Sequence, residues 1–271
     1  MIRLVPKRKF TLPVDGECIT PDIFSEKSLK EIASLYVWEG NRRRPLNELF
    51  KIDAQSESSE NSTVQICGDA EKIRRIGAQM SSGNIIIEGD AGMHLGERMG
   101  GGTISVTGNA GSWTGCAMKK GTIEIKGNAG DYLGAAYRGS VRGMRGGSIT
   151  VQGEAGNEVG LFMRGGIIKI HGNVGLFAGI HMQKGTILIQ GDAEGHVGAE
   201  MSGGKIVLCG YTPSVLPTFT IDSIKPSVKV EGEKIIGPFY RFLGDLAENG
   251  SGKLYVSQDE NRHLKTYERF L

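Results

Sequence analysis

Cysteine is scarce in this 271-residue chain, and its spacing excludes the common metal frameworks. The four cysteines lie far apart and form no Cys-x-x-Cys pair, at Cys18, Cys67, Cys116 and Cys209. Zinc and iron–sulfur sites usually need such closely spaced pairs. We therefore expect these residues to be reduced, structural thiols, as a cytosolic setting favours.

The sequence also lacks a strong charge of one sign and a long apolar run. Its formal net charge is +2, which is too balanced to indicate nucleic acid as the main partner. No stretch approaches the roughly 18 consecutive apolar residues that a membrane-spanning helix needs. The basic segment Met1–Phe10 leads into Thr11–Asp15 rather than an apolar signal core. These features predict a cytoplasmic protein with neither a nucleic-acid nor a membrane partner.

No catalytic set is recognisable. The five histidines show no metal-ligand spacing on one face, and no Ser/His/Asp or Cys/His order is present. The many Gly-x-Gly patterns belong to a repeat and do not open a helix, so they predict no nucleotide site. We expect no catalytic residue, no metal and no cofactor on this chain.

Glycine is abundant instead, and its positions define a repeat. Of the 42 glycines, only Gly16 and Gly40 precede residue 68. One series steps by 19 residues except for a single step of 26, at Gly77, Gly96, Gly115, Gly134, Gly160, Gly179 and Gly198. Seven of the nine methionines share one phase of the same repeat, at Met80, Met99, Met118, Met144, Met163, Met182 and Met201. Such regularity indicates a repeat architecture.

Within each unit, apolar β-branched residues alternate with polar ones. Ile104, Ile123 and Ile149 occupy one position, and Val106, Ile125 and Val151 occupy the position two residues further on. The residues between them are Ser105, Glu124 and Thr150. This alternation predicts strands with one buried face. A helix is excluded because each interior glycine would cost about 1 kcal/mol relative to alanine.

The short unit predicts how the strands are connected. A crossover helix between parallel strands needs a dozen or more residues besides the strands, which 19 residues do not provide. We therefore expect an all-β fold, a right-handed parallel β-helix of about seven to eight coils. Ile, Val, Ala and Met ladders would fill its interior. Glycines would take the left-handed corner conformations, and the Asp or Asn after them, such as Asp90 and Asn109, would tolerate similar strain.

The two ends lack the repeat and would cap the exposed strand edges. Residues 1–62 are expected to form an N-terminal cap, with a short helix around Ser28–Tyr36 and a polar linker at Gln55–Ser62. Residues 63–210 would form the solenoid. Residues 211–271 would form a C-terminal cap whose apolar run, Gly237–Phe242, packs on the last coil. Small irregular or helical segments are expected in both caps.

The one long step in the repeat marks a candidate site. It adds seven residues between Gly134 and Gly147, and such insertions become surface loops that often bind partners or ligands. The candidate partner- or coenzyme-binding residues in and beside it are Tyr137, Arg138, Arg142, Arg145, Arg164 and Lys119. Lys119, Arg145 and Arg164 share one phase and would repel one another, which favours an anionic ligand or an acidic partner. A solvated face with scattered counter-charges remains an equal alternative.

A second surface ladder contains aromatic residues. It comprises His94, Trp113, Tyr132, Glu158, Phe177 and His196. Two interpretations stand side by side: an adhesive strip for another protein, or a surface packed by the caps.

The repeated G-x-x-M-x-G-G-x-I-x-(I/V)-x-G-(D/N)-A-G, seen at Gly96–Gly111 and, with Val174 in place of the Ala, at Gly160–Gly175, resembles the GXGXG domain. This domain occurs at the C-terminus of the large subunit of glutamate synthase and in the C subunit of formylmethanofuran dehydrogenase. It also occurs in the bacterial relative of that C subunit within the formyltransferase/hydrolase complex. The insertion Tyr137–Gly147 and the flanking segments Pro21–Phe24 and Phe239–Asp245 resemble the C subunits.

This resemblance implies a scaffold subunit of a complex that reduces CO2 through formate to formylmethanofuran in methanogenesis, with ferredoxin as electron donor. It implies that other subunits hold the tungsten or molybdenum pterin, the [4Fe-4S] clusters and a binuclear metal site. The partners would be a metallopterin subunit, an amidohydrolase-like subunit and ferredoxin-like subunits. The bacterial relative would instead transfer and hydrolyse formyl groups without redox chemistry. A third alternative is that the arginines hold the glutamate-bearing tail of a methanofuran-type coenzyme.

Overall fold

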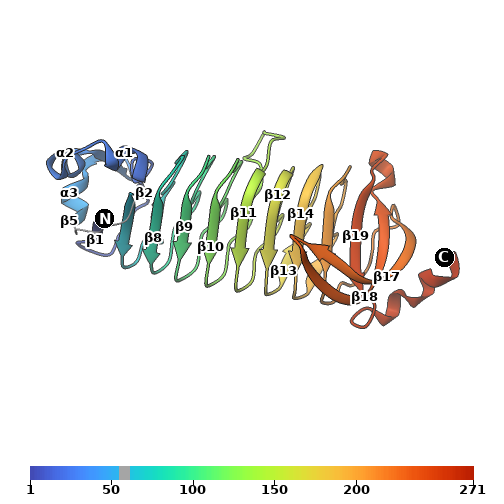
Figure 1. The fold of residues 1–271 in the computed structure, drawn as a ribbon. Helices are drawn as coiled ribbons and strands as arrows, with labels where there is room; N and C mark the ends of the chain where they lie inside the picture. The colour runs from blue at the N-terminus through green and yellow to red at the C-terminus, as the bar shows by residue number, and fades with distance from the viewer. Residues whose placement is uncertain (55–61) are drawn as a thin grey trace.

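The computed structural model describes residues 1–54 and 62–271. The linker expected at Gln55–Ser62 lies outside the described residues, apart from Ser62. The fold is mostly strand, with a few short helices near the two ends (Figure 1). Its dominant element is one large sheet whose central strands run parallel in a row.

The central strands follow one another once per sequence repeat. In spatial order they are β6 (Thr63–Cys67), β8 (Asn84–Glu88), β9 (Thr103–Val106), β10 (Thr122–Ile125), β11 (Arg145–Val151), β12 (Arg164–Ile170), β14 (Lys184–Ile189) and β16 (Lys205–Leu208). Equal positions of the repeat pair in register, as Ile104 with Ile123 and Ile123 with Ile149. The expected all-β class and parallel register are confirmed.

A second row of contacts stacks the corners of successive units. Parallel bridges join Ala70, Ala91, Ala110, Ala129 and Ala155 in sequence and continue to Val174. Further along, β13 (Val174–Leu176) pairs in parallel with β15 (Ala193–Gly195). Successive units are therefore in contact along two separate rows, in the same orientation in each.

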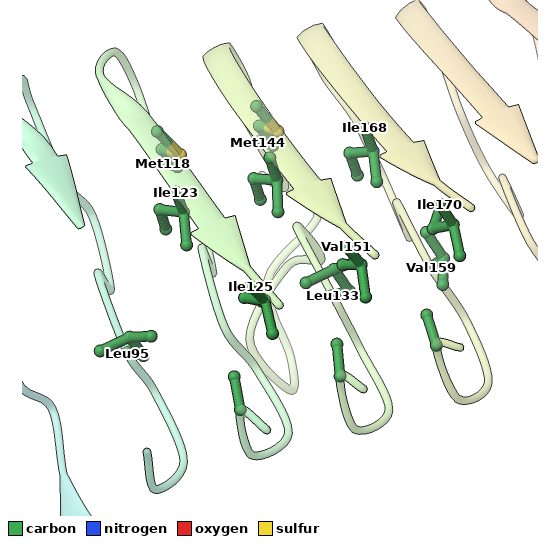
Figure 2. Packing of buried hydrophobic residues seen from close by; sticks show 14 of the residues in the cluster. Leu95, Met118, Ile123, Ile125, Leu133, Met144, Val151, Val159, Ile168 and Ile170 are labelled. Atoms are coloured by element: carbon green, nitrogen blue, oxygen red, sulfur yellow. The ribbon is translucent and has the colours of Figure 1, made fainter. Parts of the chain in front are cut away.

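The inward ladders fill the space between these rows. Figure 2 shows Met118, Ile123 and Ile125 beside Met144 and Val151 of the next unit. All five side chains are essentially buried. Full burial of such an apolar side chain contributes about 1.5–3 kcal/mol relative to exposure. The interior predicted from the alternation is confirmed.

The corners use glycine as expected but use Asp and Asn differently. Gly96 has φ +63°, and a Cβ there would lie 2.7 Å from the Cδ1 atom of Ile123. The expectation that Asp90 and Asn109 share this left-handed strain is wrong, because neither has a positive φ. Their side chains instead accept the backbone N–H of the same position one unit later, as Asn109 Oδ1 does from Asn128 at 2.8 Å. These bonds satisfy backbone groups that the corner leaves unpaired.

The N-terminal region forms more strand than expected. Its helices are α1 (Pro21–Ser25), α2 (Leu29–Ser34) and α3 (Leu46–Leu49), and its strands are β1 (Ile2–Pro6), β2 (Val14–Asp15), β3 (Tyr36–Glu39), β4 (Arg42–Pro45) and β5 (Phe50–Ala54). The helix expected near Ser28 is confirmed as α2, where Ser28 and Glu31 form a capping box. β1 and β5 extend the large sheet beyond β6, while β2, β3 and β4 form a small sheet with β7 (Ile73–Arg74).

The C-terminal region also contributes strands. They are β17 (Thr220–Val230), β18 (Glu233–Gly244) and β19 (Gly252–Ser257), joined and followed by the 3-10 helices η1 (Leu246–Glu248) and η2 (Arg262–Phe270). β19 pairs in parallel with β16, so it continues the sheet. β17 and β18 form an antiparallel hairpin whose Val230 and Phe239 pack against Val207 on the outer face of the sheet. Both ends therefore complete the sheet with strands instead of covering it with irregular chain.

In the described part of the chain, no helix has the length and apolar character required to cross a bilayer.

Candidate functional site

The insertion forms an exposed loop that projects beyond the neighbouring turns beside β11, near the middle of the rod (Figure 1). Its start is fixed by the bond from Ala136 N–H to Leu161 O at 3.0 Å, and its end by the bond from Gly143 N–H to Phe162 O at 3.1 Å. Between these anchors, Tyr137, Arg138 and Arg142 are exposed. The surface loop predicted from the long step is confirmed.

Below the loop, the aromatic ladder stacks as its spacing predicts. Trp113 lies between His94 and Tyr132, with ring centroids 5.4 and 4.4 Å away and nearly parallel planes. Each of these residues has a positive φ near 60° at the same corner of consecutive units. Because consecutive units repeat at about the strand spacing of 4.8 Å, their rings meet face to face. The same ladder continues further along with Phe177 stacked on His196 at 4.8 Å.

The insertion turns back over this ladder. The Tyr137 ring lies 5.4 Å from His94 and 6.1 Å from Trp113, and the Arg138 guanidinium lies 5.3 Å from the Trp113 ring. Trp113 is consequently only 7% exposed. The insertion thus covers the section of the ladder around Trp113. The sequence had left two interpretations of this ladder, contact with another protein or packing by the caps.

Beside the loop lies a depression that we call the cationic basin. It has a volume of about 550 Å³ and is lined by Arg98, Cys116, Ala117, Lys119, Tyr137, Arg138, Gly139, Ser140, Arg142 and Arg145. Five of these residues are cationic and none carries a carboxylate. Guanidinium and ammonium groups form their strongest hydrogen bonds with carboxylates and phosphates, and their crowding is relieved when an anion binds. The basin is therefore suited to an anion or to an acidic protein surface.

Most of the candidate residues named from the sequence meet in the basin. Tyr137, Arg138, Arg142, Arg145 and Lys119 line it, whereas Arg164 does not. Arg164 belongs to the next strand, where it pairs in register with Lys184. Sequence reasoning missed Arg98, which reaches the basin from two units earlier. The sequence did contain a signal for Arg98. It directly precedes the inward Met99, and it occupies the same position of the repeat as Ala117.

The thiol in the basin is a poor nucleophile. Burial raises the pKa of Cys116 to about 12, so the thiolate is scarce near neutral pH. All four cysteines, each within the described ranges, are free thiols. Among the described residues, no group of three His, Cys, Asp or Glu side chains is arranged to hold a metal ion.

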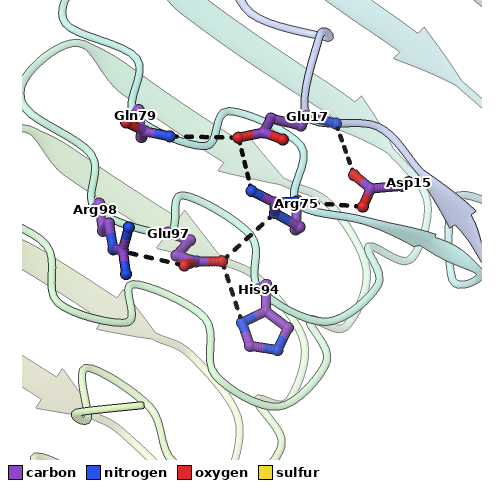
Figure 3. Close-up of polar contacts among 7 residues, drawn as sticks. All are labelled: Asp15, Glu17, Arg75, Gln79, His94, Glu97 and Arg98. Carbon is purple, nitrogen blue, oxygen red and sulfur yellow. Dashed lines mark hydrogen bonds and ion pairs between the residues drawn. The ribbon is translucent and has the colours of Figure 1, made fainter. Parts of the chain in front are cut away.

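A polar network connects His94, which lies under the loop, to the N-terminal region (Figure 3). At its centre, Arg75 lies 2.6 Å from Glu17, 3.3 Å from Asp15 and 3.7 Å from Glu97. Glu97 also lies 3.4 Å from Nδ1 of His94, whose ring contacts the ring of Tyr137. Burial lowers the pKa of His94, and Glu97 opposes this effect. These contacts tie the corner under the insertion to β2.

Comparisons with known proteins identify the relatives of this chain. No family model matches the sequence. The C subunit of molybdenum-containing formylmethanofuran dehydrogenase 1 from Methanosarcina barkeri is 45% identical over 93 residues, which are 34% of this chain and 31% of that protein. The C subunit of tungsten-containing formylmethanofuran dehydrogenase 2 from Methanococcus maripaludis is 40% identical over 89 residues, 33% and 32% of the two chains. The matched stretches thus span about a third of these curated relatives.

A solved structure extends the likeness to nearly the whole chain. It is a chain of the formyltransferase/hydrolase complex of Methylorubrum extorquens, crystallised with methylofuran. The TM-score is 0.81 and the identity is 31%, over 94% of this chain and 99% of that one. Together with the sequence relatives, this match shows that the chain belongs to the family of formylmethanofuran dehydrogenase C subunits.

Proposed function

We propose that this chain is the structural C subunit of a formylmethanofuran dehydrogenase complex, which reduces CO2 through formate to formylmethanofuran in methanogenesis with ferredoxin as electron donor. The observation that carries the proposal is the identity of 40–45% to the C subunits of both the molybdenum and the tungsten enzymes. In this proposal the chain itself supplies no catalytic residue. Its role is to hold other subunits in a fixed arrangement.

The proposal assigns the reactive groups to partner subunits. A metallopterin subunit would hold tungsten or molybdenum, ferredoxin-like subunits would hold [4Fe-4S] clusters, and an amidohydrolase-like subunit would hold a binuclear metal site. The names of the relatives support this assignment in part, because they are molybdenum- or tungsten-containing enzymes. A cytoplasmic location is part of the same proposal.

The architecture suits a scaffold. We infer that residues 63–210 wind as a right-handed parallel β-helix of about seven to eight coils, with residues 1–62 and 211–271 as its two end regions. The in-register parallel pairing of equal repeat positions supports this winding. A rod built this way is rigid because each unit packs on its neighbours along its whole length. It can therefore present the insertion at a fixed position between larger subunits.

The cationic basin is the proposed contact of this scaffold. In the first form of the hypothesis, Arg138, Arg142, Arg145 and Lys119 bind an acidic surface of a catalytic subunit. In the second form, the same groups hold the anionic tail of the coenzyme. Arg164 does not line the basin, so it takes part only where the partner or the coenzyme extends beyond the basin.

Replacement of Arg142 separates the two forms. Arg142→Ala should release a partner subunit in the first form, and should raise KM without loss of any subunit in the second. Lys120→Ala is the matched control, because Lys120 is an exposed neighbour that does not line the basin. Full assembly with unchanged KM in Arg142→Ala would contradict both forms.

A second candidate function is a place in a formyltransferase/hydrolase complex without redox chemistry. The match to such a complex over 94% of this chain favours it, whereas the higher identities are to the dehydrogenase subunits. Affinity purification of the tagged chain from its own host, followed by mass spectrometry and an assay of formylmethanofuran-dependent electron transfer, decides between them. A metallopterin subunit with activity supports the dehydrogenase. Formyltransferase and hydrolase partners alone support the second candidate, and an isolated monomer contradicts both.

A further inference from the structure

The small sheet of the N-terminal region has an outer face that nothing covers among the described residues. β3 alternates strictly: Val37 and Glu39 are buried, while Tyr36 and Trp38 are 55% and 52% exposed. An isolated exposed apolar residue needs no explanation, but two large aromatic rings on one strand face are uncommon on a solvated surface. Leu12, also exposed, lies against the turn at Gly40 beside the same strand.

Arginine accompanies the aromatic residues. The strand β4 pairs antiparallel with β3 and sets Arg43 directly opposite Trp38. The Arg43 guanidinium lies 4.2 Å from the Tyr36 ring centroid, which holds both side chains in place before any partner arrives. Exposed Trp, Tyr and Arg in one patch match the composition of interaction hot spots.

The charge of this face is not balanced within the described part of the chain. The buried Glu39 pairs with Arg8 at 2.6 Å and with Arg44 at 3.3 Å, so the inner side of the small sheet is neutralised. On the outer face, the exposed Arg43 forms no ion pair among the described residues, whereas Arg42 lies opposite Glu39 and so belongs to the inner face. Charged edge strands do protect sheets from aggregation, but protection alone does not require the neighbouring aromatic residues. A carboxylate-bearing partner complements the Arg43 guanidinium.

The face also adjoins the insertion. Asp15 of β2 lies directly opposite Trp38 in the sheet, and it lines a small pocket together with His94 and Tyr137. A partner seated on Trp38 is thus within reach of the loop. The two surfaces have the same sign of charge.

We propose that Tyr36, Trp38 and Arg43 form a protein-docking face whose occupant is an acidic surface of another subunit, with Trp38 as the central anchor. An apolar depression on the partner receives the indole, and a carboxylate at its rim pairs with Arg43. This face is separate from the cationic basin, so it holds whether the basin binds protein or coenzyme. It rests on the proposed function only in that the chain assembles with other subunits.

The test places a photoreactive benzoylphenylalanine at position 38 of the full chain, within the complex purified from its own host. Irradiation should crosslink position 38 to one partner subunit, at a segment that mass spectrometry identifies as rich in Asp and Glu. Trp38→Ala and Arg43→Glu should each weaken the association of that partner by about tenfold or more. The loss in Arg43→Glu should be recovered in part by reversal of a carboxylate in the crosslinked segment.

A matched control is available at the other end of the chain. There Phe270 is 63% exposed and Arg269 lies 4.6 Å from its ring, so Phe270→Ala and Arg269→Glu remove an equivalent pair outside the proposed face. Both controls should leave association unchanged, and circular dichroism should show that all variants remain folded.

Three results would overturn the proposal. They are crosslinks only to a second copy of this chain, crosslinks to a neutral or basic segment, and unchanged association in both Trp38→Ala and Arg43→Glu. Because Arg142→Ala is scored separately, failure of this face and failure of the basin can be told apart.

Discussion

One position of the repeat differs in character between the middle strands β9 and β10 and the later strands β14 and β16. It lies between the two inward residues of each strand and points to the outer face of the sheet. In β9 and β10 it is Ser105 and Glu124, which are half-buried and exposed, respectively. In β14 and β16 it is Leu188 and Val207, which are fully buried. The inner face, by contrast, is apolar throughout.

The difference is due to the C-terminal hairpin. β17 and β18 place Val228, Val230 and Phe239 over Leu188 and Val207, and this forms a second hydrophobic cluster outside the main core. Two polar contacts also join the hairpin to the sheet. Lys169 pairs with Glu231 at 2.6 Å, and the Lys205 ammonium donates to Lys229 O at 2.6 Å. Ser105 and Glu124 lie outside this cluster. The repeat therefore sets the inner face, whereas the covering elements determine the outer one.

The largest expected effect is on the inner face. Ile149→Ala removes a fully buried side chain and should cost about 3–5 kcal/mol in the free energy of unfolding, because the closely packed ladder cannot collapse into the cavity. Chemical denaturation measures this loss. Thr150→Ala, the next residue and outward-facing, is the control, with about 0.5 kcal/mol or less. Equal losses would contradict the assignment of faces.

The second effect tests the hairpin. Leu188→Ala should cost about 2 kcal/mol, since it opens a cavity under Phe239. Ile86→Ala changes the equivalent position of β8, which is half-buried and lies outside that cluster, and should cost less than about 1 kcal/mol. If the two variants denature alike, the hairpin does not stabilise the later strands.

A smaller effect is expected for the ion pair that ties the hairpin to the sheet. Lys169→Met keeps most of the aliphatic stem and should cost about 0.2–1 kcal/mol, with a smaller loss at high salt. Thermal denaturation at two salt concentrations measures it. Lys126→Met is the control, because Lys126 is exposed and forms no ion pair among the described residues. A loss independent of salt would indicate packing and not charge as its cause.

The smallest expected effect is on the pKa of His94, which lies under the insertion. Burial lowers the pKa of His94, so its neutral form is favoured in the folded chain. The resulting stability is present above the ordinary pKa of about 6.5 and is lost as the pH falls toward the lowered value, because the unfolded state then binds more protons.

Tyr137→Ala should move the His94 pKa back toward its ordinary value by exposing the ring to water. NMR titration of the His94 ring measures this change in pKa. The charged neighbours Asp15, Glu97, Arg74 and Arg75, which also act on the ring, are the same in both chains. Val141→Ala, an exposed change in the same loop, should leave the pKa where it is. An unaltered pKa in Tyr137→Ala would show that the insertion does not bury His94.

Much of the fold was predictable from the sequence because it is local and repeated. Strand register, the inward ladders and the stacking of His94 on Trp113 all follow from a 19-residue period. The role of Asp90 and Asn109 was misjudged, because their hydrogen bonds join units that only the folded chain brings together.

The candidate site was predictable in part. The length of the insertion identified Tyr137, Arg138 and Arg142 as a surface loop, and the shared phase brought in Lys119 and Arg145. The direction of the loop was not predictable, since it depends on packing against Trp113 and on bonds to Leu161 and Phe162. For this reason Arg98 was missed and Arg164 was included.

The inner face of the rod is specified by the amino-acid sequence alone, since a strict period forces identical residues into one ladder whatever surrounds them. What covers the outer surfaces depends on the tertiary structure. The hairpin on Leu188, the insertion on Trp113 and the strands at both ends are contacts between segments with no common period. Their geometry depends on loop closure and side-chain packing across the whole chain, which no single stretch of sequence specifies.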